Sequence, residues 1–173
     1  MMKAHIAAGF AMIGLAQSAA AQPAQATACL SVVQAEALVT YLLPKAVDAS
    51  RTKCATSLPA TAPLMRRNSQ QLAKYRAASE TAWPQAKMAV NVLAGKSLPP
   101  ELDDAVLRPI ADAMFTQLIE KEIKLKDCTI IGKIYGDLEP MPSTNLASLA
   151  ITIVQAAAKD GKKQDIPICK APA

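Results

Sequence analysis

Apolar and polar positions along the chain follow a helical period almost throughout. Apolar residues recur at spacings of three and four, which is the pattern of one face of an α-helix. Proline-containing breaks separate the periodic stretches, and the clearest one covers residues 55–63. We therefore expect a single compact all-α bundle of about five to seven helices. The predicted helical segments are 31–43, 45–53, 69–94, 101–123, 128–139 and 143–160.

Three of the predicted helices carry a proline: Pro44, Pro84 or Pro109. Proline lacks a backbone N–H and its ring crowds the preceding turn, so it kinks or ends a helix. We expect Pro44 to divide the first helical stretch into two pieces. Pro84 is expected to kink the third segment after Trp83.

The segment 101–123 has a clear apolar stripe at steps of four residues. Because residues four apart lie on the same side of a helix, this stripe is the predicted apolar face of the segment. Its members are Leu102, Val106, Ile110, Met114 and Leu118.

The composition supports a helical globular domain. Hydrophobic residues make up 51% of the chain, largely as alanine, while aromatic residues make up only 3%. These fractions exclude a disordered chain and a multi-span membrane protein, and the scarcity of aromatic residues and glycine argues against a β-sandwich or barrel. Alanine-rich helices can pack closely because their side chains are small.

The first 21 residues have the pattern of a secretory signal peptide. A basic start at Lys3 precedes an apolar run over 4–16, and Ala19-Ala20-Ala21 supplies the small residues of a cleavage site. An uncleaved anchor helix is the alternative. After cleavage we expect a periplasmic or secreted single domain over 22–173, with no transmembrane span and an extended tail from about residue 161.

Removal of the signal peptide changes the charge and the available chemistry. It takes away Lys3 and no acidic residue, so the net charge falls from +5 to +4. It also takes away His5, the only histidine. Histidine-dependent triads and histidine-ligated zinc sites are therefore excluded from the mature chain, and nucleotide-binding loops are absent too. We predict no catalytic motif, no metal site and no cofactor.

Four cysteines remain in the mature chain: Cys29, Cys54, Cys128 and Cys169. In an exported protein they are expected to form structural disulfides. Three pairings are possible, and the sequence alone does not select one. A helical-hairpin argument favours Cys29–Cys54 and Cys128–Cys169, because each pair brackets two predicted helical segments.

Carboxylates provide the main enzymatic alternative. Glu101, Asp103, Asp104 and Asp112 lie on or next to one predicted helix, and paired carboxylates can act as acid and base in glycoside cleavage. However, Asp104, Arg108 and Asp112 follow each other at steps of four, which is typical of a solvated ladder of salt bridges. We prefer the ladder to a catalytic site.

Two further groups of residues are candidates for binding. Basic residues gather at Arg66, Arg67, Lys74 and Arg76 and form a candidate anion-binding surface, with ordinary solubilising charge as the alternative. Nucleic acid is not an expected partner, because aromatic residues that stack on bases are scarce. The residues of a candidate apolar pocket are Tyr75, Trp83, Met88 and Met114, which more often simply fill a core.

The mature chain carries the short motifs Cys29-Leu30, Ala35-Glu36-Ala37-Leu38, Ala82-Trp83-Pro84, Lys126-Asp127-Cys128 and Ile168-Cys169-Lys170. With these motifs the chain resembles a group of exported alphaproteobacterial proteins with four cysteines. The resemblance implies an exported helical domain, and the group has no established activity to transfer.

The sequence thus favours a non-enzymatic exported protein that binds an envelope protein or a small amphipathic or anionic ligand. The alternatives are a carboxylate-dependent hydrolase of cell-wall glycans and an envelope stress chaperone.

Overall fold

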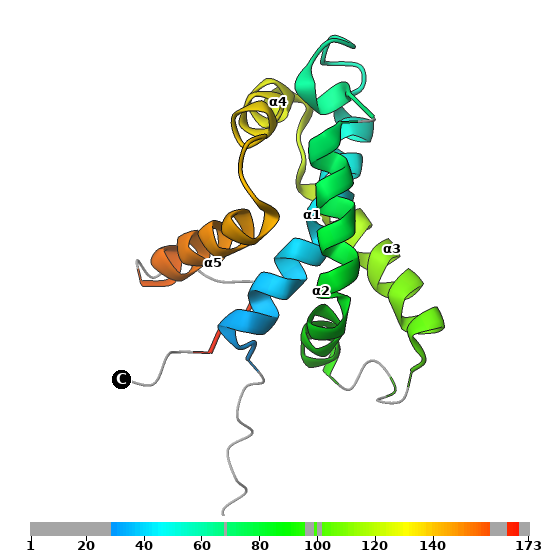
Figure 1. The fold of residues 1–173 in the computed structure, drawn as a ribbon, viewed down its shortest axis with the longest axis vertical. Helices are drawn as coiled ribbons and strands as arrows, with labels where there is room; N and C mark the ends of the chain where they lie inside the picture. The colour runs from blue at the N-terminus through cyan, green and yellow to red at the C-terminus, as the bar shows by residue number, and fades with distance from the viewer. Residues whose placement is uncertain (1–28, 68, 96–98, 100–101, 160–165, 170–173) are drawn as a thin grey trace, which may run out of the picture.

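Five α-helices and two short 3₁₀ turns make up the described part of the chain (Figure 1). The structure is a computed structural model, and it describes residues 29–67, 69–95, 99, 102–159 and 166–169. The elements are α1 (Val32–Cys54), η1 (Pro63–Met65), α2 (Gln70–Ala94), α3 (Asp104–Glu122), η3 (Leu125–Asp127), α4 (Cys128–Asp137) and α5 (Ser143–Lys159). The predicted all-α bundle is confirmed. The predicted signal peptide lies outside the described residues.

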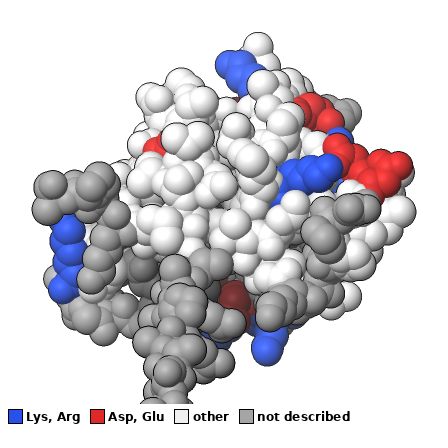
Figure 2. All heavy atoms as spheres, turned by 90° about the horizontal axis from the view of Figure 1, so that it is seen from below, with Lys and Arg blue, Asp and Glu red and all other residues white. Residues whose placement is uncertain are grey.

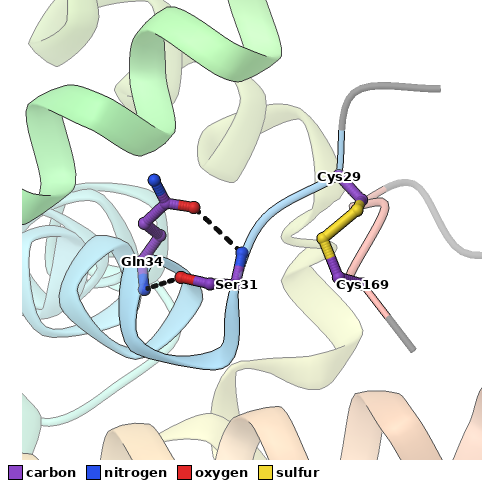
Figure 3. Close-up of a disulfide and its surroundings, with 4 residues drawn as sticks. All are labelled: Cys29, Ser31, Gln34 and Cys169. Atoms are coloured by element: carbon purple, nitrogen blue, oxygen red, sulfur yellow. Dashed lines mark hydrogen bonds between the residues drawn. A yellow bond between two sulfur atoms is a disulfide. The ribbon is translucent and has the colours of Figure 1, made fainter. Parts of the chain in front are cut away.

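α1 is the helix on which the others pack, and it contacts each of the other four α-helices. α2 runs beside α1, while α3 lies on one side of this pair and α4 and α5 lie on the other (Figure 1). The start of α1 is fixed by the Ser31–Gln34 capping box (Figure 3). The Gln34 N–H donates to Ser31 Oγ over 3.2 Å, and the Ser31 N–H donates to Gln34 Oε1 over 2.9 Å.

The predicted division of this helix at Pro44 is wrong. α1 continues for 23 residues through Pro44, which is buried. In the turn before the proline, Ser79 Oγ of α2 donates a buried 2.8 Å hydrogen bond to the carbonyl of Tyr41. α2 and α3 also continue through their prolines, Pro84 and Pro109, and both of these are exposed.

The buried side chains form two clusters, one at each end of the α1–α2 pair. The first cluster joins the early part of α1 to the later part of α2, α3 and α5. Its members are Leu30, Ala35, Leu38, Tyr41, Trp83, Ala86, Ala89, Val90, Leu107, Ala111, Phe115 and Ile151. The second cluster joins the end of α1 to the start of α2 and to α4. Its members are Val47, Cys54, Leu64, Leu72, Tyr75, Cys128 and Tyr135.

The cysteines are paired as Cys29–Cys169 and Cys54–Cys128, with Cα–Cα distances of 5.0 and 5.5 Å. The pairing favoured by the hairpin argument is therefore wrong. The physical reason is the continuity of α1, because a 23-residue helix is roughly 34 Å long at 1.5 Å per residue, far beyond the reach of a disulfide between its ends. The prediction that all four cysteines form disulfides is confirmed.

The Cys29–Cys169 disulfide belongs to a terminal clasp, formed by Cys29–Leu30 and Ile166–Cys169 (Figure 3). Leu30 forms a parallel bridge with Ile168. The Leu30 N–H donates to the Pro167 carbonyl over 2.7 Å, and the Cys169 N–H donates to the Leu30 carbonyl over 2.8 Å. The clasp holds the fully buried Leu30 side chain in the first cluster.

Among the described helices, none combines the length and the hydropathy that a membrane crossing requires.

The Cys54–Cys128 bond is expected to stabilise the second cluster strongly, since it closes a loop of 74 residues. Replacing either cysteine with alanine should lower the free energy of unfolding by about 4 kcal/mol in non-reducing buffer. The double variant Cys54→Ala/Cys128→Ala should lose little more than either single variant, because each single change already removes the same bond. Denaturant unfolding measures all three values, and additive losses would contradict the pairing.

Candidate functional site

Three surface features of the described residues are candidates for function. They are a polar hollow between α1, α2 and α3, a basic hollow between α1 and the segment around η1, and the outer face of α3. Each is built from side chains that the helices of the preceding section hold in place.

The polar hollow has a volume of about 230 Å³ and is lined by three cations and three carboxylates. Each carboxylate accepts from a cation on a neighbouring helix. Lys45 pairs with Asp112 over 2.8 Å, Arg108 with Glu80 over 2.6 Å, and Arg76 with Asp48 over 3.4 Å. The charges balance, so the hollow offers neither a free cation nor a free carboxylate to a ligand.

Tyr41 lies beneath this network and is fully buried. Its hydroxyl donates to Asp112, and its ring lies 4.8 Å from the ring of Trp83 between centroids. The Arg108 guanidinium lies over both rings, at 5.6 Å from the Tyr41 centroid and 5.3 Å from the Trp83 centroid. Burial, followed by the hydrogen bond to Asp112, raises the pKa of Tyr41.

The predicted salt-bridge ladder along α3 does not form. Asp104 binds Lys87 and also accepts from Trp83 Nε1 over 3.0 Å, so its partners are on α2. These two hydrogen bonds lower the pKa of Asp104. Arg108 and Asp112 bind α2 and α1, as described above, because the side of α3 that carries them faces those helices. These ion pairs therefore join α3 to α1 and α2.

The other described carboxylate considered for catalysis serves as a helix cap. Asp103 is the N-cap of α3 and accepts from the Ala105 N–H over 3.2 Å. Glu101 lies outside the described residues. A general acid in glycoside cleavage needs a carboxyl group kept neutral by an apolar setting, whereas Asp104 and Asp112 are both bound to lysines.

The structure does not gather the four residues of the candidate apolar pocket. Tyr75 lies in the second buried cluster, and Trp83 lies in the first. Eight residues of helix separate them by about 12 Å along the axis, which is the distance between the two clusters along α2. Met88 and Met114 are both exposed at the surface.

The four residues of the candidate anion-binding surface, Arg66, Arg67, Lys74 and Arg76, are all exposed. Arg76 is paired with Asp48. Arg67 lines the basic hollow, which has a volume of about 400 Å³ and is also lined by Arg51. Sequence reasoning missed Arg51, and its only local signal was the spacing of three residues from Asp48.

The outer face of α3 is apolar and exposed. The stripe formed by Val106, Ile110, Met114 and Leu118 is 40–52% exposed, whereas Leu107, Ala111 and Phe115 on the other side are buried. Four members of the predicted stripe therefore face away from the core, whereas the fifth, Leu102, packs against the first cluster. We call these four residues the outer stripe. Between residues 106 and 118, no exposed residue of α3 is charged.

Uncharged surface is also broad on the face of the molecule that lies at the bottom in Figure 1. Figure 2 shows a face on which charged side chains lie near the edges of a broad uncharged area. Within the described ranges, no group of three or more His, Cys, Asp or Glu side chains is placed to hold a metal ion.

The substitution Tyr41→Phe is expected to reduce the loss of stability at alkaline pH. Because the pKa of Tyr41 is raised on folding above its ordinary value of about 10, the folded state holds the phenolic proton more tightly than the unfolded state. This contribution to the free energy of unfolding is complete below about pH 10 and is lost as the pH rises further.

Denaturant unfolding at several pH values above neutrality measures the effect. Burial also raises the pKa of Tyr75, so Tyr41→Phe/Tyr75→Phe should show a flatter profile than either single variant. A Tyr41→Phe profile identical to that of the native chain would contradict the prediction.

Comparisons of the chain with protein-family models, with curated proteins and with solved structures found no match.

Proposed function

We propose that the protein is an exported, non-enzymatic helical domain that binds another envelope protein along the outer stripe of α3. The observation that carries the proposal is the orientation of this helix. Its mid-helix charges, Arg108 and Asp112, are bound to neighbouring helices, while the four apolar side chains of the outer stripe are exposed. Exposed apolar patches with polar surroundings are typical of protein interaction sites.

The continuity of the stripe supports a helical partner. Val106, Ile110, Met114 and Leu118 occur at steps of four, so they form a ridge along the helix over about 18 Å at 1.5 Å per residue. Such a ridge fits the groove between the corresponding side chains of another helix. The expected partner surface is an uncharged, apolar helix face.

Two disulfides and the signal-peptide pattern support an oxidising compartment outside the cytoplasm. No specific observation favours the hydrolase alternative, since Asp104 and Asp112 already accept from cations. The stress-chaperone alternative has no separate observation in its favour.

Photo-crosslinking in cells that export the protein tests the proposal. With p-benzoylphenylalanine at position 114, on the outer stripe, we expect one discrete adduct with a second protein. The same reagent at position 77, an exposed alanine of α2, should give no such adduct.

Ile110→Asp should abolish the adduct, because it places a charge in the centre of the stripe. Ile153→Asp is the matched control, since Ile153 is an exposed isoleucine on α5, and the adduct should persist in this variant. No adduct, equal adducts from positions 77 and 114, or an adduct between two copies of the chain would overturn the proposal.

A further inference from the structure

The basic hollow between α1 and the segment around η1 has the dimensions and the chemistry of a small-molecule site. Its volume of about 400 Å³ falls within the range of roughly 300–1,000 Å³ typical of ligand pockets. Thr52 of α1 and the C-cap residue Ala55 line one side, and Met65 and Arg67 line the other. The walls therefore combine apolar side chains with guanidinium groups.

One guanidinium of this hollow is rigidly placed. The Arg51 side chain is only 9% exposed. Its Nε–H donates to the Leu64 carbonyl over 2.9 Å, while its two terminal nitrogens donate to Asp48 over 2.6 Å and to the Arg66 carbonyl over 3.3 Å. These bonds use three of its five N–H groups, so two remain for an acceptor in the hollow.

The Asp48 carboxylate in the wall of the basic hollow does not prevent an anion from binding there. Asp48 accepts from Arg51 through one oxygen and from Arg76 through the other, so its charge is compensated on both sides. Arg67 is the second cation of the wall, and no described residue forms a hydrogen bond or ion pair with its side chain. The hollow thus has a net positive charge and one uncommitted guanidinium.

We propose that this hollow binds an amphipathic organic phosphate. The phosphate oxygens accept from Arg67 and from the remaining N–H groups of Arg51. A guanidinium group can donate two parallel hydrogen bonds to a phosphate, which makes arginine well suited to this role. The apolar body of the ligand lies against Met65 and Ala55. This site is separate from the outer stripe of α3, so the proposal does not depend on the proposed function.

Isothermal titration calorimetry with octyl phosphate below its aggregation concentration tests the site in the oxidised, mature chain. We expect saturable binding of one molecule, with weaker binding of inorganic phosphate, which lacks the apolar body. Octanol, which lacks the charge, should bind more weakly than octyl phosphate as well. In NMR spectra, the methyl signals of Met65 and Ala55 should shift on addition of octyl phosphate.

Arg67→Gln should weaken octyl phosphate binding by about tenfold or more, as expected for the loss of a charged hydrogen bond. Arg66→Gln is the matched control, because it makes the same charge change at the neighbouring exposed position, whose side chain does not line the hollow. Its affinity should stay close to that of the native chain.

Three results would overturn the proposal. One is equal weakening by Arg67→Gln and Arg66→Gln, which would indicate a diffuse charge effect. Another is equal binding of octanol and octyl phosphate. The third is binding to phosphatidylglycerol vesicles without binding of monomeric octyl phosphate, which would indicate a membrane surface in place of a pocket.

Discussion

The hydrogen bond from the Ser79 hydroxyl of α2 to the Tyr41 carbonyl of α1 joins the two longest helices where Pro44 disturbs the bonding within α1. An internal proline costs a helix about 3 kcal/mol or more, and packing against α2 stabilises α1 in spite of it. Because α1 remains continuous, its two ends lie far apart, and each is fixed by a different disulfide. The terminal clasp holds its start, and α4 is held to its end. The two buried clusters then form on either side of the proline.

The orientation of α3 follows from polar interactions, and its apolar content alone would not specify it. The helix has large apolar residues on both sides, so burial of either side would remove apolar surface from water. Only one of these orientations lets Asp112 accept from Tyr41 and Lys45 while Arg108 reaches Glu80 and the faces of two aromatic rings. Buried hydroxyls and partly buried charges require partners, and these requirements leave the outer stripe exposed. The polar interactions that hold α3 in place therefore also leave its outer stripe exposed.

Much of the fold could be predicted from the sequence because its signals are local. The capping box at Ser31 and the breaks around residues 55–63 and Pro140 each act within a few residues. The errors concern contacts between distant segments. Pro44 is buried where α1 meets α2, whose Ser79 is 35 residues away in the sequence, and the disulfide pairing follows from the continuity of α1 through this proline. The partners of Asp104 and Arg108 are on α2, and Arg51 enters the basic hollow only because the η1 segment folds back over α1. Contacts between residues that are far apart in the sequence leave no local pattern from which a single sequence could predict them.

Disulfide mapping under non-reducing conditions tests most directly whether α1 is continuous and bonded at opposite ends. Trypsin cleaves after lysine and arginine, and such residues separate all four cysteines, so each cysteine falls in a different peptide. The account predicts that the peptide covering residues 54–66 is linked to the peptide covering residues 127–133, and that the Cys29 peptide is linked to the Cys169 peptide. A link between Cys29 and Cys54 would require the helix to fold back at Pro44 and would contradict the account.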